Sequence, residues 1–303
     1  EKLLYLERRE DIFSAVRGSS LRDYFYTADD LPDFEDILNR RYLAEVEEIK
    51  RFSPSPAVCD FFVLPYEFMN LKNFLKEKIY GLHPTRRFPS TIDDGIWSEL
   101  WSGDKRRHDL PDVYEEAVAA LRAPGESDVG QDPDGPDLVD RVLDGHLMNY
   151  LPTLVAGLKS ELIREYVRDY RRLKGILMLQ RVPTGREAAT LWFLKEDELF
   201  ETVIRGRPRH WRQILLEVVP TEVVEKIVEG HRRDLLSRYE KHTSDYLTKR
   251  LEPARYVAFG PEKVFGYLSG LTTELLNLRL LIGGKMNRLN QQSIRDMLRR
   301  TYI

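Results

Sequence analysis

Residues 67–75 read EFMNLKNFL, and the prediction of the fold starts from this stretch. An acidic residue opens it, Asn stands three positions later, Leu and a basic residue follow, and Leu closes it. The same pattern, with Arg allowed for Asn and Ile for the last Leu, recurs at 169–177 and 274–282, roughly a hundred residues apart each time. Repeats of this length are duplicated domain-sized units, longer than ordinary solenoid repeats. The sequence therefore predicts a body built from three related units.

On a helix, the acid and the Asn or Arg lie three positions apart and share a face, while the leucine pair marks a neighbouring apolar stripe. One interpretation is structural: the polar pairs fix helix packing within each unit. The other places them on a shared surface that touches a partner. Arg172 replaces Asn in the middle copy, so bonding specific to Asn cannot be common to all three. The motif residues are Glu67, Asn70, Leu71 and Lys72; Asp169, Arg172, Leu173 and Lys174; Glu274, Asn277, Leu278 and Arg279.

The repeat extends beyond the motif. Phe52 and Pro54 precede Asn70 by the same distances at which Phe259 and Pro261 precede Asn277. A second element recurs at 138–146 and 223–231, and each copy ends in Gly-His. Because several matches follow in one order, chance is a poor explanation for the repeat.

Composition describes a highly charged globular protein, with 303 residues, 42% hydrophobic residues and 32% charged residues. The net charge of −3 disfavours nucleic acid as the main partner, since phosphate binding needs a cationic surplus. The single cysteine, Cys59, lies among apolar residues and is interpreted as a buried hydrophobe rather than a nucleophile. No apolar run reaches the ~18–20 residues that span a bilayer, and no secretory signal is visible, so we expect a cytoplasmic location.

Apolar periodicity predicts helices nearly throughout. Pro65 would mark a fresh start or a kink in the second helix, and Gly81 would end it. Residues 123–137, rich in Pro, Gly and acids, read as an exposed loop, and 189–194 as an extended loop. The fold class is therefore all-α, with three helical lobes at 1–104, 105–207 and 208–303. The helices are expected at 31–49, 57–80, 92–101, 110–121, 138–151, 154–180, 196–204, 211–218, 222–251, 261–286 and 291–302.

Catalytic and metal signals are weak. None of the six histidines has a recognised metal spacing, and neither a phosphate-binding loop nor a nucleophile elbow occurs. Gly283-Gly284-Lys285 lies inside a helical pattern and reads as a helix irregularity. The adjacent carboxylates of Asp93 and Asp94 are better explained as helix-start charge. The sequence predicts no catalytic residue, no metal site and no cofactor.

Two basic clusters follow the short helices of the first and second units. A solvated charged loop is the ordinary interpretation. The sharper hypothesis is contact with acidic protein loops or with anionic lipid headgroups, where each cation adds about 1 kcal/mol. The clusters consist of Lys105, Arg106 and Arg107, and of Arg205, Arg207, Arg209 and Arg212.

These residues resemble a known family. Residues 66–76, which read YEFMNLKNFLK, look like the "D-x-x-N-L" helix of the C subunit of V-type and archaeal-type rotary ATPases, whose eukaryotic counterpart is the d subunit. Residues 259–268 and 274–285 are a closer match, similar to the family's C-terminal signature "N-L-R-x-(I/L)-(I/L)-x-x-K" that follows a Pro-led helix. The likeness covers the whole chain in layout. Arg172 and the acidic loop at 123–137 depart from it.

The resemblance implies three homologous lobes arranged like a funnel with pseudo-threefold symmetry. It also implies a non-catalytic central-stalk connector, peripheral to the membrane. Such a connector links the proteolipid rotor ring to the D- and F-type shaft subunits and transmits torque for ATP-coupled ion transport. The alternative is a diverged stand-alone helical scaffold that no longer binds these partners.

Overall fold

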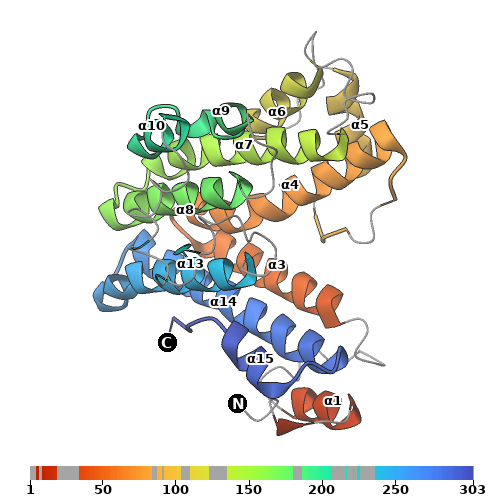
Figure 1. Ribbon diagram of the computed structural model, residues 1–303, viewed down its shortest axis with the longest axis vertical. Helices are drawn as coiled ribbons and strands as arrows, with labels where there is room; N and C mark the ends of the chain where they lie inside the picture. The colour runs from red at the N-terminus through yellow and green to blue at the C-terminus, as the bar shows by residue number, and fades with distance from the viewer. Residues whose placement is uncertain are drawn as a thin grey trace. The chain divides into compact units, whose positions relative to one another are not determined.

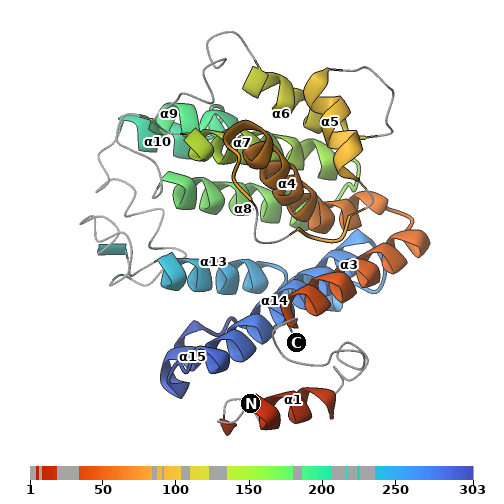
Figure 2. The ribbon, with the colours of Figure 1, turned by 90° about the vertical axis from the view of Figure 1, so that its right-hand side faces the viewer.

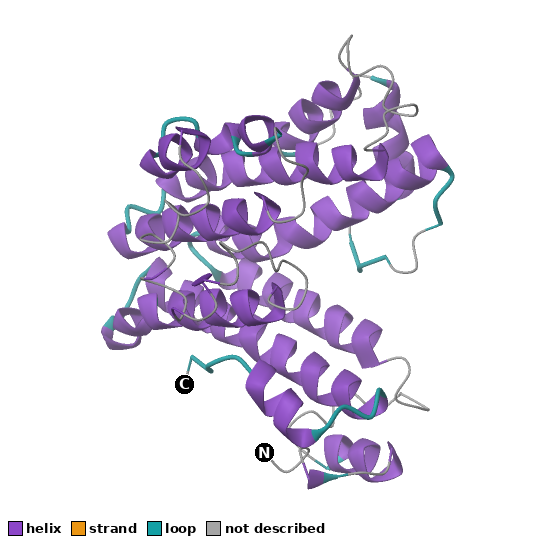
Figure 3. Cartoon of the chain, in the orientation of Figure 1, coloured by secondary structure: helices purple, strands orange, loops and turns teal. Residues whose placement is uncertain are grey.

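The computed structural model confirms the all-α prediction: its described residues form helices and loops, and no strand occurs among them (Figure 3). The described residues are 5–6, 9–18, 34–83, 87–90, 92–103, 110–122, 135–179, 186–205, 216, 221, 224–225 and 236–302.

The chain divides into two compact units, drawn in Figures 1 and 2. Unit 1 joins the two ends of the chain, Glu1–Cys59 and Trp211–Ile303, and unit 2 is Asp60–His210. This division groups elements by contact and does not test the three lobes at 1–104, 105–207 and 208–303, which stay a prediction, as does their pseudo-threefold arrangement.

In unit 1, α14 contacts α1, α3, α13, α15 and η5, a short 3₁₀ helix. The side chains of Val46, Leu251, Phe265 and Leu268 are fully buried around it. α3 and α14 lie side by side in both views and are joined by a hydrogen bond of 2.8 Å between the Tyr42 and Thr272 hydroxyls (Figures 1 and 2). The elements of unit 1 are α1 (Arg9–Arg17), α3 (Phe34–Phe52), α13 (Leu236–Arg250), η5 (Glu252–Tyr256), α14 (Pro261–Met286) and α15 (Gln291–Met297).

In unit 2, α7 is the central helix and packs against α6, α8, α9 and the 3₁₀ helix η3. An aromatic core joins three elements: the Phe68 ring stacks on Tyr114 at 5.1 Å, and the Trp97 ring meets Tyr114 edge-on at 5.3 Å. The elements of unit 2 are α4 (Pro56–Tyr80, whose first residues fall in unit 1), α5 (Asp94–Ser102), α6 (Asp112–Arg122), α7 (Gly135–Ala156), α8 (Glu161–Leu179), α9 (Glu187–Thr190), η3 (Trp192–Leu194) and α10 (Glu198–Arg205).

Several helix ends follow the predicted chemistry. α4 ends at Gly81, whose φ of 65° is a left-handed conformation that suits glycine. α5 begins after Asp93, whose side chain accepts a hydrogen bond of 3.0 Å from the Ile96 amide. α14 runs from Pro261 to Met286 as predicted, and Gly283 and Gly284 lie within it.

Four expectations about helices were wrong or incomplete. α4 continues through Pro65, which excludes a fresh start there, while the alternative of a kink stays a prediction. α7 likewise continues through Pro152, because the buried Leu151 and Val155 hold the turn that loses a hydrogen bond at the proline. Residues 189–194 form the end of α9 and the helix η3 rather than an extended loop. α1 was not predicted.

Other expectations fall partly outside the described residues. Of the predicted loop 123–137, the described part, 135–137, is the first turn of α7. Within the predicted helix 222–251, α13 is described from Leu236 to Arg250. The predicted helix at 211–218 lies outside the described residues except for position 216, which is helical.

Candidate partner-binding surface

The first motif copy holds the segment at 87–90 against α4. The Asn70 amide nitrogen donates to the Phe88 carbonyl at 3.1 Å, and its oxygen accepts from the Phe88 N–H at 2.8 Å. The Ser90 hydroxyl donates to the Glu67 carboxylate at 2.5 Å. Burial raises the pKa of Glu67, and hydrogen bonds from Ser90 and Asn70 partly offset this. One side chain thus satisfies both backbone groups of Phe88.

The third copy repeats this geometry. The Asn277 amide nitrogen donates to the Arg299 carbonyl at 2.9 Å, and its oxygen accepts from the Arg299 N–H at 2.8 Å. The next amide, Arg300 N–H, donates to Asp245 at 2.5 Å. These bonds end α15 at Met297 and draw residues 298–302 along α14 and α13, so the predicted helix to 302 was wrong.

The middle copy reaches its neighbouring segment with different chemistry. The Arg172 Nε donates to both carboxylate oxygens of Asp197 at 2.9 Å. That carboxylate also accepts from the Leu199 amide at 2.9 Å, at the start of α10. The neighbouring Arg171 donates to the Phe193 carbonyl, and burial lowers the pKa of Arg171. An ion pair therefore stands where the other copies have an amide clamp.

The basic position of the motif points toward neighbouring helices in two of the copies. Lys72, which is 7% exposed, donates to Asp144 of α7 at 2.6 Å. Arg279 donates to Asn39 of α3. Lys174 is exposed and lies 5.7 Å from the Tyr170 ring centre.

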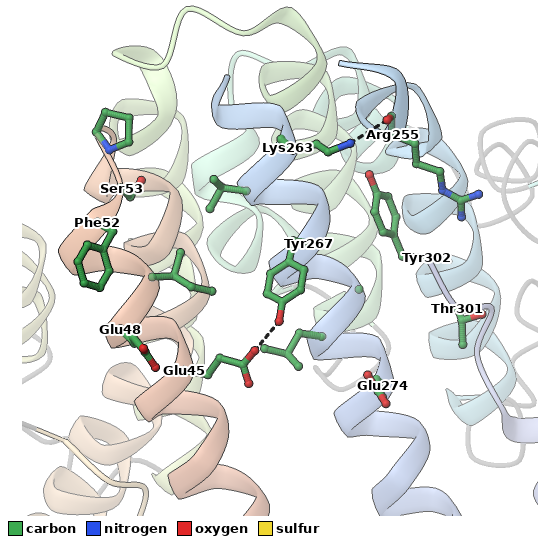
Figure 4. Close-up of a pocket in the computed structure, with 15 residues that line it drawn as sticks. Glu45, Glu48, Phe52, Ser53, Arg255, Lys263, Tyr267, Glu274, Thr301 and Tyr302 are labelled. Carbon is green, nitrogen blue, oxygen red and sulfur yellow. Dashed lines mark hydrogen bonds between the residues drawn. The ribbon is translucent and has the colours of Figure 1, made fainter. Parts of the chain in front are cut away.

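The candidate site is a groove of about 1060 Å³ in unit 1 (Figure 4). Its floor is one face of α14, and α3 forms one wall with Ile49 and Phe52. Arg255 of η5 and residues Thr301 and Tyr302 of the C-terminal segment form the other wall. The lining is mainly apolar, which is typical of a surface that buries a ligand or a partner.

Charged groups gather at opposite ends of this groove. Lys263 and Arg255 stand at one end in Figure 4, and Glu45, Glu48 and Glu274 at the other. The Lys263 amine donates to the Arg255 carbonyl at 2.8 Å, and the Arg255 guanidinium lies 5.0 Å from the Tyr302 ring centre. The groove is thus electrostatically polarised along its length.

A hydroxyl ties the floor of the groove to the α3 wall. The Tyr267 hydroxyl donates to the Glu45 carboxylate, shown dashed in Figure 4. This contact joins α14 to α3 at the acidic end of the groove.

The repeat-equivalent phenylalanines are both exposed. Phe52 ends α3 with 82% of its surface accessible, and Phe259, just before α14, has 91%. Tyr256 of η5 is 89% exposed. Large aromatic side chains left in water are costly, and Phe52 lines the groove, so its exposure favours an interaction surface there. The sequence contained the Phe repeat but gave no sign of its exposure.

The basic clusters predicted as contacts are not described by the structure. Lys105, Arg106 and Arg107 lie outside the described residues, as do Arg207, Arg209 and Arg212. Arg205 ends α10, but its side chain is also outside them. Their role as ring or membrane contacts therefore stays a prediction.

The described part of the chain has neither a metal-binding cluster nor a membrane-spanning helix. Its residues contain no cluster of three or more His, Cys, Asp or Glu side chains suited to a metal. None of its helices is long and apolar enough to cross a membrane. Cys59 is buried, as predicted.

Comparison with known proteins identifies the class. The model of the ATP synthase (C/AC39) subunit family matches residues 1–297, and the chain belongs to this family. Among individual proteins, the chain is similar to the C subunit of the V-type sodium ATPase of Enterococcus hirae. The two are 23% identical over 330 aligned positions, which cover 100% of this chain and 92% of the relative. The expected family is therefore confirmed.

Proposed function

We propose that this chain is a non-catalytic connector of a rotary ATPase of the V or archaeal type. In this role it lies peripheral to the membrane on the cytoplasmic side, between the proteolipid rotor ring and the D- and F-type shaft subunits. It transmits torque between ATP turnover and ion movement. The observation that carries the proposal is the family match over residues 1–297.

The contacts of the repeat suit such a part. A connector needs stiffness under load, and the Asn70, Arg172 and Asn277 side chains each tie a neighbouring segment to a motif helix. We propose that these contacts are structural rather than direct partner contacts. The transported ion is set elsewhere in the complex, because a connector has no need of an ion site.

Binding of the purified full chain to its partners tests this function. The chain is mixed with purified D- and F-type shaft subunits and, separately, with ring-containing membranes, and bound protein is measured at physiological salt. A connector binds both. Binding to neither identifies a diverged stand-alone scaffold and overturns the proposal.

The basic clusters supply the attachment to the ring in this proposal. Reversing the charges at 105–107 together with those at 205, 207, 209 and 212 should weaken attachment to ring-containing membranes, with a larger effect at low salt. Attachment that is unchanged at physiological salt would remove this contact from the account.

A further inference from the structure

The groove of unit 1 has the length of a short helix. Lys263, Tyr267 and Glu274 lie on one face of α14 and span about three turns, or roughly 16 Å at 1.5 Å per residue. Its volume of about 1060 Å³ is at the upper limit of small-molecule pockets, which are about 300–1,000 Å³. An open groove of this size favours a segment of polypeptide over a small ligand.

The wall opposite α3 depends on two glycines of α14. A Cβ built at Gly266 would lie 2.3 Å from the Tyr302 hydroxyl oxygen, and one at Gly270 would lie 3.0 Å from the Tyr302 Cβ. The absence of side chains there lets Tyr302 lie against α14, while Asn277 holds Arg299 three residues earlier. The side of the groove opposite α3 is therefore a wall held in place by close packing and hydrogen bonds.

The apolar face between two charged ends specifies the chemistry of an occupant. Val264, Leu271 and Phe52 would cover an apolar stripe, which on a helix recurs at positions i, i+3, i+4 and i+7. The three glutamates at one end would meet basic side chains, and Lys263 and Arg255 at the other would meet acidic ones.

We propose that this groove binds one amphipathic α-helix, about three turns long, from another subunit of the ATPase. The end of this helix that meets Glu45, Glu48 and Glu274 carries basic residues, and the end that meets Lys263 carries acidic residues. The identity of the source as an ATPase subunit rests on the proposed function. The chemistry of the helix rests on the groove itself.

A charge-matched pair of variants tests the electrostatic part. Glu48→Lys with Glu274→Lys reverses the acidic end of the groove, while Glu47→Lys with Asp296→Lys changes net charge equally at exposed positions outside it. Each labelled full chain is titrated into the ATPase complex depleted of this subunit. The groove pair should weaken binding about tenfold at low salt and less at high salt. The control pair should stay within about twofold; equal effects of the two pairs would overturn the assignment.

A second pair tests the apolar part. Phe52→Glu should weaken the same binding about tenfold, because it places a charge at an aromatic anchor. Leu289→Glu, at a residue 44% exposed beyond the other end of α14, is the control and should leave binding unchanged. Both positions are exposed, and circular dichroism and thermal unfolding of each variant establish that it is folded. Full binding by a folded Phe52→Glu chain would contradict the proposal.

Photo-crosslinking identifies the occupant. Phe52 is replaced by p-benzoylphenylalanine in the full chain, the complex is assembled and irradiated, and the joined peptides are sequenced. A segment of another ATPase subunit with helical apolar periodicity and a basic end supports the inference. Products only with a second copy of this chain, with lipid, or within the same chain overturn it. If the chain binds shaft and ring yet yields only those products, the inference fails and the proposed function stands; if it binds neither shaft nor ring, the function fails.

Discussion

α4 and α14 carry the same asparagine clamp in different settings. Asn70 is buried and fixes a short loop of unit 2 that leads into α5. Asn277 is half-buried and fixes the C-terminal segment that walls the groove of unit 1. A side-chain amide offers a donor and an acceptor side by side, which suits a single extended residue on an adjacent segment. The same side-chain amide thus fixes a partly exposed loop in unit 2 and shapes the wall of a groove in unit 1.

α8 shows what changes when the amide is absent. Arg172 donates to the Asp197 carboxylate instead of binding backbone groups, and that carboxylate also caps the start of α10. Both solutions attach a neighbouring segment to a motif helix. The link through Arg172 has a charged partner and is therefore sensitive to the loss of either residue.

The largest effect is expected at the buried clamp. Asn70→Ala should lower the free energy of unfolding by about 2–3 kcal/mol, because both backbone groups of Phe88 lose their partner. Chemical denaturation measures this. Asn149→Ala, at an exposed position on α7, serves as the control and should cost under about 0.5 kcal/mol. Equal costs at the two positions would show that the clamp contributes nothing.

A smaller stability effect with a functional consequence is expected at the second clamp. Asn277→Ala should cost about 1–2 kcal/mol, because this clamp is nearer to solvent than Asn70. It should also weaken binding to the depleted complex, since the Tyr302 wall is released. Asn287→Ala, which removes an exposed bond to the Gly283 carbonyl, is the matched control. Loss of stability with full binding would separate the clamp from the groove.

The ion pair of α8 should contribute less. Arg172→Met is expected to cost about 1 kcal/mol, and a double-mutant cycle with Asp197→Asn should give a coupling of the same order. Urea is the suitable denaturant because it adds no salt. A coupling energy near zero would show that Arg172 does not stabilise its neighbouring segment as the two asparagines do.

The smallest effect concerns pH and unit 2. Burial lowers the pKa of His146, with the Glu116 carboxylate partly opposing it, and its ring lies 5.0 Å from that of Trp192. The folded state thus favours the neutral imidazole. Stability is complete above the ordinary pKa of about 6.5 and falls as the pH drops from there toward the lowered value. His146→Gln should make the free energy of unfolding depend less on pH in this region. Denaturation at a series of pH values from about 7.5 to about 5, which includes the ordinary histidine pKa, measures this. An unchanged slope would exclude His146 as its source.

Local sequence chemistry predicted much of the fold. Local signals between neighbouring residues predicted the helical class and the bounds of several helices. These signals are the proline at the start of α14, Gly81 after α4 and the leucine spacing of the motif. Expectations failed where distant contacts decide. Pro152 stays inside α7 because of packing, and the end of α15 is set by Asn277, some twenty residues earlier.

The groove could not be predicted from the sequence, because contacts between distant residues form it. It requires α3 to lie beside α14, although Tyr42 and Thr272, which join them, are 230 residues apart. The repeated Phe52 and Phe259 were visible as a pattern, but their exposure depends on the folded unit. Charge at the groove ends likewise comes from three separate parts of the chain.

The most direct test of the connector is coupling. Proteoliposomes holding the ATPase complex with this chain, without it, or with it added back are assayed for ATP hydrolysis and ion uptake in parallel. A connector predicts that removal abolishes ATP-driven uptake while the catalytic sector still hydrolyses ATP, and that the added chain restores uptake. Undiminished uptake without the chain would contradict the account.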